Sequence, residues 1–176
     1  MPTSKPKGKD LIAKWVQDHN DIQRVLDVGC GQGTYPILLK KTYPILNHAE
    51  WWGIEVWDKY IQQFDLPSLY DHIIQDDARK IDWSMLPEFD LVIFGDVLEH
   101  MTKQESQELV RLALTRSRYV VISIPIHHSP QGAYEGNPYE IHVKDDWSHQ
   151  EVMDSFPNIR DWLKKTKTIG VYWIER

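Results

Sequence analysis

Short apolar runs alternate along this chain with segments of helical periodicity, and no other feature of the sequence restricts the fold as strongly. The runs expected to form buried strands are Arg24–Val28, Trp51–Glu55, His72–Gln75, Asp90–Gly95 and Arg118–Ile124. Most of them lack strict alternation of apolar and polar residues, as is typical of parallel strands that are covered on both faces. Repeated β-α units of this kind predict an α/β fold with a doubly wound, mostly parallel sheet and helices on both faces.

Several segments between these strands carry helix start signals. Thr102 and Glu105, and again Ser148 and Glu151, form the capping pattern S/T-x-x-E at the head of a helical stretch. The expected helices are Lys9–His19, Lys103–Ser117 and Ser148–Phe156, and another is expected to begin near Tyr35-Pro36.

The end of the chain is expected to form a strand pair within Ile159–Glu175. Its second part, Thr168–Glu175, alternates like a half-buried antiparallel strand. We find no internal repeat and no linker, and 176 residues suit one domain over residues 1–176, with an N-terminal helix within residues 1–20.

Composition limits the class of protein. With a net charge of −6, the chain lacks the excess of Lys and Arg that is expected of a nucleic-acid binder. No apolar run reaches the roughly 18–20 residues needed to cross a bilayer, so no membrane association is expected. The polar stretch Met1–Asp10 lacks the apolar region of a signal peptide, which predicts a cytoplasmic location. The single cysteine, Cys30, cannot form an internal disulfide.

A glycine-rich loop follows the first expected strand, at the edge of the sheet where such folds bind ligands. The segment Asp27-Val28-Gly29-Cys30-Gly31-Gln32-Gly33 has the spacing G-x-G-x-G. Glycines allow the backbone to turn tightly and to approach a ligand closely. The dinucleotide fingerprint G-x-G-x-x-G would need a glycine at Thr34. Asp27 favours a cationic ligand over a pyrophosphate.

Acidic residues also follow the next two strands. Glu55, with Val56 beside it, lies about 20 residues beyond the glycines, where nucleotide-binding sheets place an acid against ribose hydroxyls. After the third strand, Asp77 is suited to accept a hydrogen bond from an adenine amino group, with Ala78 flanking the ring. The sequence therefore predicts an adenosine-containing ligand.

Together these segments resemble the class I, Rossmann-like S-adenosylmethionine-dependent methyltransferases. The loop over residues 27–33 is similar to their first motif, Glu55 to their ribose-binding acid, and Asp77-Ala78 to their adenine-side motif. Asp96-Val97-Leu98-Glu99-His100 is similar to the D-x-L-E-H ending of the fourth strand in one large subgroup. The resemblance covers roughly residues 25–126 and extends more loosely to the C-terminal hairpin.

The resemblance implies a seven-stranded sheet with an antiparallel C-terminal strand, and S-adenosylmethionine as the cofactor. It further implies that Gly29 and Gly31 approach the methionine portion of the cofactor, with Gly33 completing the loop. The Gly95 region would supply a backbone carbonyl near the methionine amino group.

Candidate catalytic bases lie after the fourth and fifth strands, namely His100, His127 and His128. The long stretch Pro125–Trp147 is expected to be a mobile, substrate-facing lid, because long loops in compact domains are commonly functional. Its candidate substrate contacts are Tyr134, Tyr139, Glu140 and His142. The spacing of His127, His128, Glu140 and His142 matches no zinc pattern, so no metal site is expected.

The sequence thus favours methyl transfer to an oxygen or nitrogen nucleophile of a small-molecule or protein acceptor, with nucleic acid not expected. Three other functions stay open at this point. They are a non-catalytic or partner-dependent cofactor-binding module, an enzyme that degrades the cofactor, and a nucleotide-dependent enzyme such as a dehydrogenase. Thr34 argues against a dehydrogenase, because it stands where the dinucleotide fingerprint has its third glycine. The acceptor and the oligomeric state are not encoded in a recognisable pattern.

Overall fold

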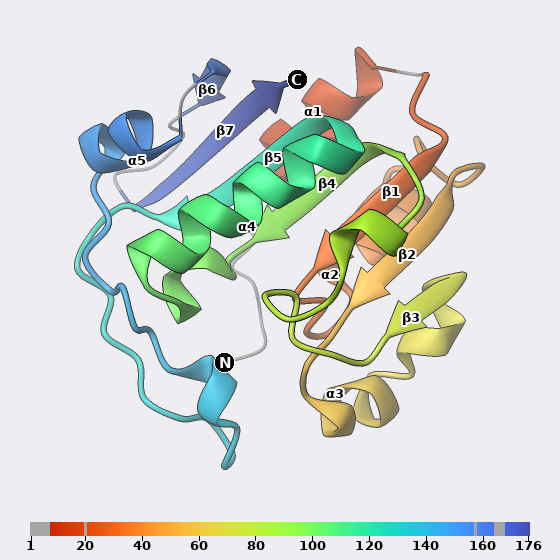
Figure 1. Ribbon diagram of the computed structural model, residues 1–176. Helices are drawn as coiled ribbons and strands as arrows, with labels where there is room; N and C mark the ends of the chain where they lie inside the picture. Colours follow the sequence, from red (N-terminus) through yellow and green to blue (C-terminus); the bar gives the residue numbers. More distant parts are fainter. Residues whose placement is uncertain (1–7, 20, 157, 164–167) are drawn as a thin grey trace.

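The computed structural model describes residues 8–19, 21–156, 158–163 and 168–176. Within these residues a seven-stranded sheet has the order β3-β2-β1-β4-β5-β7-β6 (Figure 1). The strands are β1 Arg24–Val28, β2 Glu50–Ile54, β3 His72–Ile74, β4 Phe89–Gly95, β5 Ser117–Pro125, β6 Ile159–Leu163 and β7 Ile169–Glu175. The first five pair in parallel, whereas β7 is antiparallel to both β5 and β6. The predicted mostly parallel sheet with an antiparallel C-terminal strand is confirmed.

Helices cover both faces of the sheet. The α-helices are α1 Lys9–Gln17, α2 Thr34–Pro36, α3 Asp58–Gln63, α4 Lys103–Arg116 and α5 His149–Ser155. A π-helical turn, Ile37–Thr42, continues α2, and short 3-10 turns lie at Leu66–Ser68, Trp83–Met85, Leu98–His100 and Pro138–Glu140. None of the helices within the described ranges is long and apolar enough to span a lipid bilayer.

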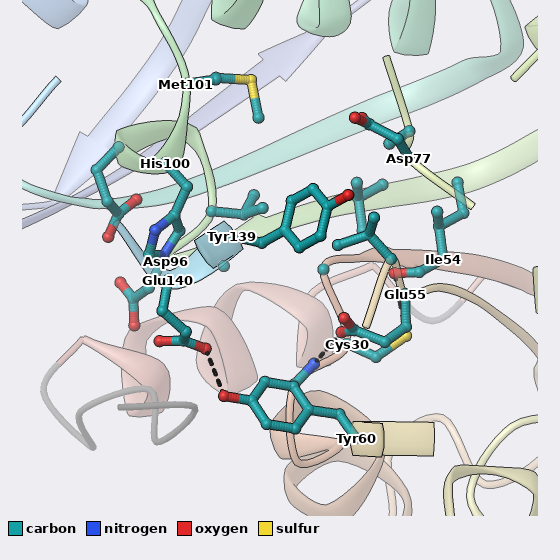
Figure 2. A pocket seen from close by; sticks show the side chains of 18 of the residues that line it. Cys30, Ile54, Glu55, Tyr60, Asp77, Asp96, His100, Met101, Tyr139 and Glu140 are labelled. Carbon is teal, nitrogen blue, oxygen red and sulfur yellow. Dashed lines mark hydrogen bonds between the residues drawn. The ribbon is translucent and has the colours of Figure 1, made fainter. Parts of the chain in front are cut away.

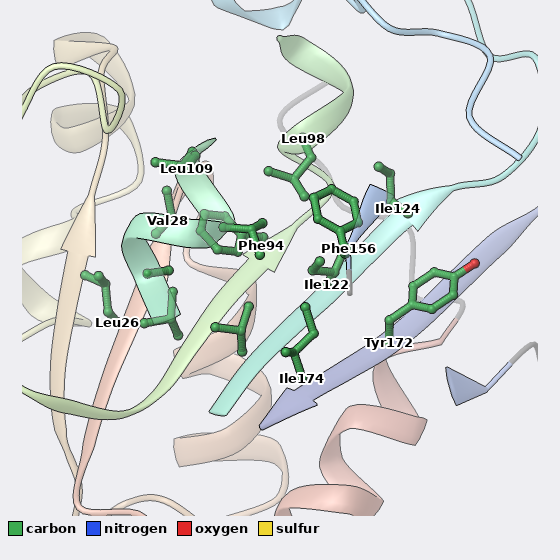
Figure 3. Close-up of a cluster of buried hydrophobic side chains, with 14 of the residues drawn as sticks. Leu26, Val28, Phe94, Leu98, Leu109, Ile122, Ile124, Phe156, Tyr172 and Ile174 are labelled. Carbon is green, nitrogen blue, oxygen red and sulfur yellow. The ribbon is translucent and has the colours of Figure 1, made fainter. Parts of the chain in front are cut away.

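The two faces of the sheet have separate apolar cores, because successive side chains of a strand point to opposite sides. In β4, Val92 and Phe94 pack on the side of α4 and α5, whereas Leu91 and Ile93 pack on the side of α1 and α2. Figure 3 shows part of the first core. Burying each such side chain contributes about 1.5–3 kcal/mol, which explains why these strands are apolar throughout.

The capping prediction is confirmed in full for α4 and in part for α5. At α4, the Thr102 hydroxyl accepts from the Glu105 N–H at 3.3 Å, and the Glu105 carboxylate accepts from the Thr102 N–H at 2.8 Å. At α5, the Ser148 hydroxyl accepts from the Glu151 N–H at 3.1 Å. The Glu151 carboxylate instead pairs with lysines, among them Lys103 at 3.2 Å.

One expectation about the C-terminal strand is wrong. Residues Ile169 to Ile174 of β7 are buried, so the strand is not half-exposed. It lies inside the sheet between β5 and β6 and contributes Val171 and Trp173 to one core and Tyr172 and Ile174 to the other. Of the predicted N-terminal helical region, residues 1–7 and 20 lie outside the described residues.

Candidate active site

A cavity lies at the carboxyl ends of the parallel strands, where β1, β2, β3 and β4 run into their loops. Its lining includes Val28–Gly31 at the end of β1, Ile54–Val56 at the end of β2, Asp76–Arg79 after β3, and Gly95–Val97 at the end of β4. Figure 2 shows Glu55 and Asp77 on one side of this cavity, and Asp96, His100 and Glu140 on the opposite side. The topology therefore brings the separate polar segments of the sequence to one place.

The glycine loop forms the turn between β1 and α2. Gly29, Gly31 and Gly33 all have left-handed φ angles, of 72°, 50° and 72°. A Cβ atom added to Gly29 would lie 2.7 Å from the Val97 side chain, so the close approach of the β1 and β4 loops requires glycine there. Gly33 is not part of the cavity lining; it faces Leu69, which a Cβ would meet at 2.3 Å.

Asp27 lies beneath the glycine loop and does not line the cavity, in contrast to the expected direct contact with the ligand. Its side chain is buried and accepts a hydrogen bond from the Tyr70 hydroxyl at 2.6 Å. Burial raises the pKa of Asp27 to about 7, although the Tyr70 hydrogen bond acts in the opposite direction. The Asp27 side chain therefore contacts Tyr70 in the interior and does not face the cavity.

Glu55 lines the cavity at the end of β2 and fixes the glycine loop. One carboxylate oxygen accepts from the Gly31 N–H at 2.9 Å and the other accepts from the Trp57 N–H at 2.9 Å. Burial raises the pKa of Glu55, while these two backbone donors lower it. Each oxygen keeps a second lone pair, so the carboxylate is able to accept two further hydrogen bonds from a diol.

Asp77 and Ala78 also line the cavity, as expected from their position after β3. The Asp77 carboxylate forms a bidentate pair with Arg79, at 2.9 and 2.7 Å. This pairing, with further help from the Arg79 N–H, holds the pKa of Asp77 below its usual value. Arg79 also donates to Glu105 at 2.8 Å, which ties the β3 loop to α4.

Gly95 ends β4 and Asp96 follows it, and both residues line the cavity. Asp96 has a left-handed φ of 56°, which is uncommon for a residue other than glycine. Its carboxylate lies 3.3 Å from the ammonium group of Lys9, which is itself almost completely buried. Lys9 was not predicted at the site, because it belongs to a polar stretch with no sequence signal for burial.

Glu99, His100 and His142 gather at the same end of the cavity. Burial, followed by the influence of Asp96, raises the pKa of Glu99 well above its usual value. Burial also lowers the pKa of both histidines, and the proximity of His142 lowers that of His100 further. Both imidazoles are therefore held neutral near pH 7.

The β5–α5 segment, residues 126–148, packs along the cavity through specific backbone contacts. The N–H groups of Val143 and Lys144 both donate to the Glu99 carbonyl, at 2.9 and 3.0 Å. The Tyr60 hydroxyl donates to the Glu140 carboxylate at 3.1 Å (Figure 2). Residues of this segment that line the cavity are Ser129, Gln131, Asn137, Tyr139, Glu140 and His142.

Besides Asp27 and Gly33, three candidate catalytic or substrate residues lie outside the cavity lining. His127 places its Nδ1 atom 3.1 Å from the Thr168 carbonyl oxygen, and His128 is mostly exposed beside Asp145. Tyr134 is also absent from the lining. The structure therefore does not bring His127 or His128 to His100. Tyr60 and Glu99 line the cavity instead, and neither was predicted as a site residue.

Comparisons with known proteins agree with this geometry. A family model described as a methyltransferase domain matches residues 25–116. No curated protein matches the chain by sequence. Among solved structures, a SAM-dependent methyltransferase from Archaeoglobus fulgidus has 17% identity and a TM-score of 0.66, with 96% of this chain and 95% of that chain covered.

Two further structures have the same fold. An S-adenosylmethionine-dependent methyltransferase from Clostridium acetobutylicum ATCC 824 is 12% identical, with a TM-score of 0.69 over 94% of this chain and 89% of that chain. Magnesium protoporphyrin IX methyltransferase from Synechocystis PCC 6803, solved with bound SAM, is 16% identical, with a TM-score of 0.65 over 95% and 77%. At these identities the structures establish the fold, while the family match covers more than half of the chain. The chain therefore belongs to the class I S-adenosylmethionine-dependent methyltransferases.

Proposed function

We propose that this cavity binds S-adenosylmethionine and that the chain transfers the methyl group to an oxygen or nitrogen atom of a small-molecule acceptor. The observation that carries the proposal is the convergence of Gly29, Gly31, Glu55 and Asp77 on one cavity. Their order along the strand ends suits the order of the methionine, ribose and adenine portions of the cofactor. Ala78 and Val56 also line the cavity; Ala78 would flank the adenine, and Val56 would lie beside the ribose.

Glu55 has the arrangement that ribose recognition needs. Its carboxylate is oriented by two backbone donors, which leaves one lone pair on each oxygen for the vicinal hydroxyls. Because the Gly31 N–H is one of those donors, the same hydrogen bond fixes the position of the glycine loop relative to the methionine portion of the cofactor. We therefore assign the ribose to Glu55 and the backbone-lined part of the cavity to the methionine group.

The bound cofactor supplies an electrophilic methyl group, and the residues of the chain align the acceptor for an in-line displacement. An oxygen or nitrogen nucleophile loses a proton during the reaction. His100 is a neutral imidazole in the lining and so is able to accept one. Tyr139, Glu140 and His142 also line the cavity and are assigned to the acceptor.

The charges around the cavity favour a small acceptor over nucleic acid. The lining contains the acids Glu55, Asp76, Asp77, Asp96, Glu99 and Glu140. The one arginine in the lining, Arg79, is engaged by Asp77 and Glu105. A phosphate backbone would be repelled by this surface, because binding of nucleic acid depends on exposed Lys and Arg.

Calorimetry tests the first half of the proposal, and transfer of a labelled methyl group to a panel of hydroxyl and amine acceptors tests the second. Glu55→Gln keeps the size of the side chain but replaces one acceptor oxygen with a donor. We expect it to weaken S-adenosylmethionine binding by about 1–3 kcal/mol, the range for a hydrogen bond to a charged group.

The matched control is Glu50→Gln, which changes an acid at the opposite end of the same strand, where it pairs with Arg24. This variant is expected to bind S-adenosylmethionine like the unmodified protein. An affinity of Glu55→Gln within twofold of the unmodified protein would remove Glu55 from the site.

We also propose that the β5–α5 segment opens and closes over the acceptor. Tyr60→Phe removes the hydrogen bond that holds Glu140 against α3, and this change is expected to increase local opening about tenfold, equivalent to about 1.4 kcal/mol. Local opening is measured as the rate of proteinase K cleavage at Gly132 and Gly136, which are both exposed. Tyr43→Phe, at an exposed tyrosine elsewhere, serves as the control. Equal cleavage rates in the two variants would show that the segment is a fixed crossover.

A further inference from the structure

Three side chains from two separate loops meet at the acceptor end of the cavity. Glu99 and His100 belong to the 3-10 turn after β4, and His142 belongs to the β5–α5 segment. One carboxylate oxygen and one ring nitrogen from each histidine all lie within 4.8 Å of one another. The histidine rings face each other edge to face, with centroids 4.9 Å apart.

Both rings are oriented by contacts to backbone carbonyls. The Nδ1 atom of His100 lies 3.2 Å from the Ile141 carbonyl oxygen, and the Nδ1 atom of His142 contacts the Ser129 carbonyl oxygen. A carbonyl can only accept, so each Nδ1 carries the proton and each Nε2 keeps its lone pair. Histidines that bind metals are typically held in this way, with the second nitrogen donating to a carbonyl or carboxylate.

The carboxylate of Glu99 provides an independent observation. The residue is 2% exposed, and its Oε2 atom is buried without a hydrogen-bond partner among the described residues. A buried polar atom without a partner costs about 1–3 kcal/mol. Asp96 and Glu140 add negative charge around Glu99, and Lys9 is the cation that offsets part of it. A bound dication would satisfy this oxygen and compensate the local charge.

We propose that Glu99, His100 and His142 form a three-ligand site for a divalent transition-metal ion such as Zn²⁺. Two imidazoles and one carboxylate favour ions of this type over Mg²⁺ and Ca²⁺, which prefer oxygen ligands. The expectation of no metal site considered His127 and His128, which the structure places outside the cavity lining. Glu99 and His100 take their place.

Binding of the metal ion would also hold the β5–α5 segment in place through His142. Metal–ligand bonds of about 2.0–2.1 Å in a tetrahedral site hold the donor atoms about 3.4 Å apart. His142 would therefore move toward His100 and bring its segment closer to the cavity. Three protein ligands leave one coordination position open. Its role rests on the proposed function: an acceptor hydroxyl bound there would lose its proton to solvent more readily, and the ion would take over the part assigned above to His100, whose Nε2 lone pair would then bind the metal.

The test uses tag-free full-length protein that has been stripped with a chelator. Zn²⁺ is titrated by calorimetry, and Co²⁺ by its visible absorption, which reports ligand type and geometry. We expect one ion per chain. His100→Ala and His142→Ala should each weaken Zn²⁺ binding at least about 100-fold, because loss of a second-shell partner alone costs about 10–100-fold. Glu99→Gln, which keeps the shape of the side chain, should weaken it at least tenfold.

His48→Ala is the matched control, because His48 is exposed in the turn before β2. This variant should bind Zn²⁺ like the unmodified protein. Absence of stoichiometric binding, or equal affinity in the His142→Ala and His48→Ala variants, would overturn the proposal. Glu99→Gln keeps the test decisive if removal of a histidine disturbs the fold. S-adenosylmethionine affinity, measured on the stripped protein, separates failure of the metal site from failure of the proposed function.

Discussion

Gly31→Val is expected to abolish S-adenosylmethionine binding while the protein stays folded. Gly31 lines the cavity, and its φ of 50° lies in the left-handed region, which β-branched residues strongly disfavour. Its N–H also donates to Glu55, so a shift of the backbone would disturb the proposed ribose contact as well. Calorimetry should show an affinity loss of at least about 100-fold, which corresponds to about 2.8 kcal/mol.

Gly132→Val is the control for the introduced side chain. A Cβ at Gly132 meets no atom within 4 Å, and this glycine does not line the cavity. It should bind S-adenosylmethionine normally. Gly31→Ala, which adds only a methyl group, is expected to lose an intermediate amount of affinity for S-adenosylmethionine. This variant tests the prediction if valine prevents folding. A folded Gly31→Val protein with unchanged affinity would show that the cofactor lies elsewhere.

Asp27→Asn is expected to stabilise the protein, and the gain should grow with pH. Because burial raises the pKa of Asp27 from 3.8 to about 7, the folded protein holds a proton that the unfolded chain releases above pH 4. The unmodified protein therefore loses stability as the pH rises from about 4 to about 7. Asparagine carries no charge and can still accept the Tyr70 hydrogen bond. The gain in unfolding free energy should be on the order of 4 kcal/mol at pH 8 and about half of that at pH 5.

Urea denaturation of both proteins at pH 5 and pH 8 measures this difference. Asp58→Asn, which changes an exposed acid in the first turn of α3, should show no comparable dependence on pH. A gain for Asp27→Asn that is the same at both pH values would mean that Asp27 is not protonated in the folded protein. A loss of stability at pH 8 would mean that its charge contributes to the fold.

The sheet could be predicted from the sequence because its signals are local. Apolar runs set the strands, and the Thr102–Glu105 capping box marked the start of α4 within one residue. The fully buried state of β7 was not predicted, because it depends on both faces of the strand being covered, one by the core that contains α1 and the other by the core that contains α5. The alternation of apolar and polar residues in Thr168–Glu175 does not show which elements pack against the less apolar face of the strand.

The site was predictable where a strand end determines the direction of a side chain. Glu55 and Asp77 line the cavity, as their positions after β2 and β3 suggested. Asp27 lies outside the cavity lining, and the sequence did not indicate this, because β1 is apolar on both faces and its pattern does not show which face Asp27 joins. His127 and His128 depend on the path of a long loop, and this path is set by distant partners such as Glu99 and Tyr60.

The position of β7 has a consequence for how the chain assembles on the ribosome. β7 is the last described strand to be synthesised, yet it separates β5 from β6, and β6 pairs with β7 alone. While residues 169–175 are still inside the exit tunnel, β5 presents an open edge and β6 has no partner. Such an edge is a template for pairing with other chains. The sheet can therefore close only after β7 has left the tunnel, and until then the nascent chain is most exposed to aggregation and most dependent on chaperones.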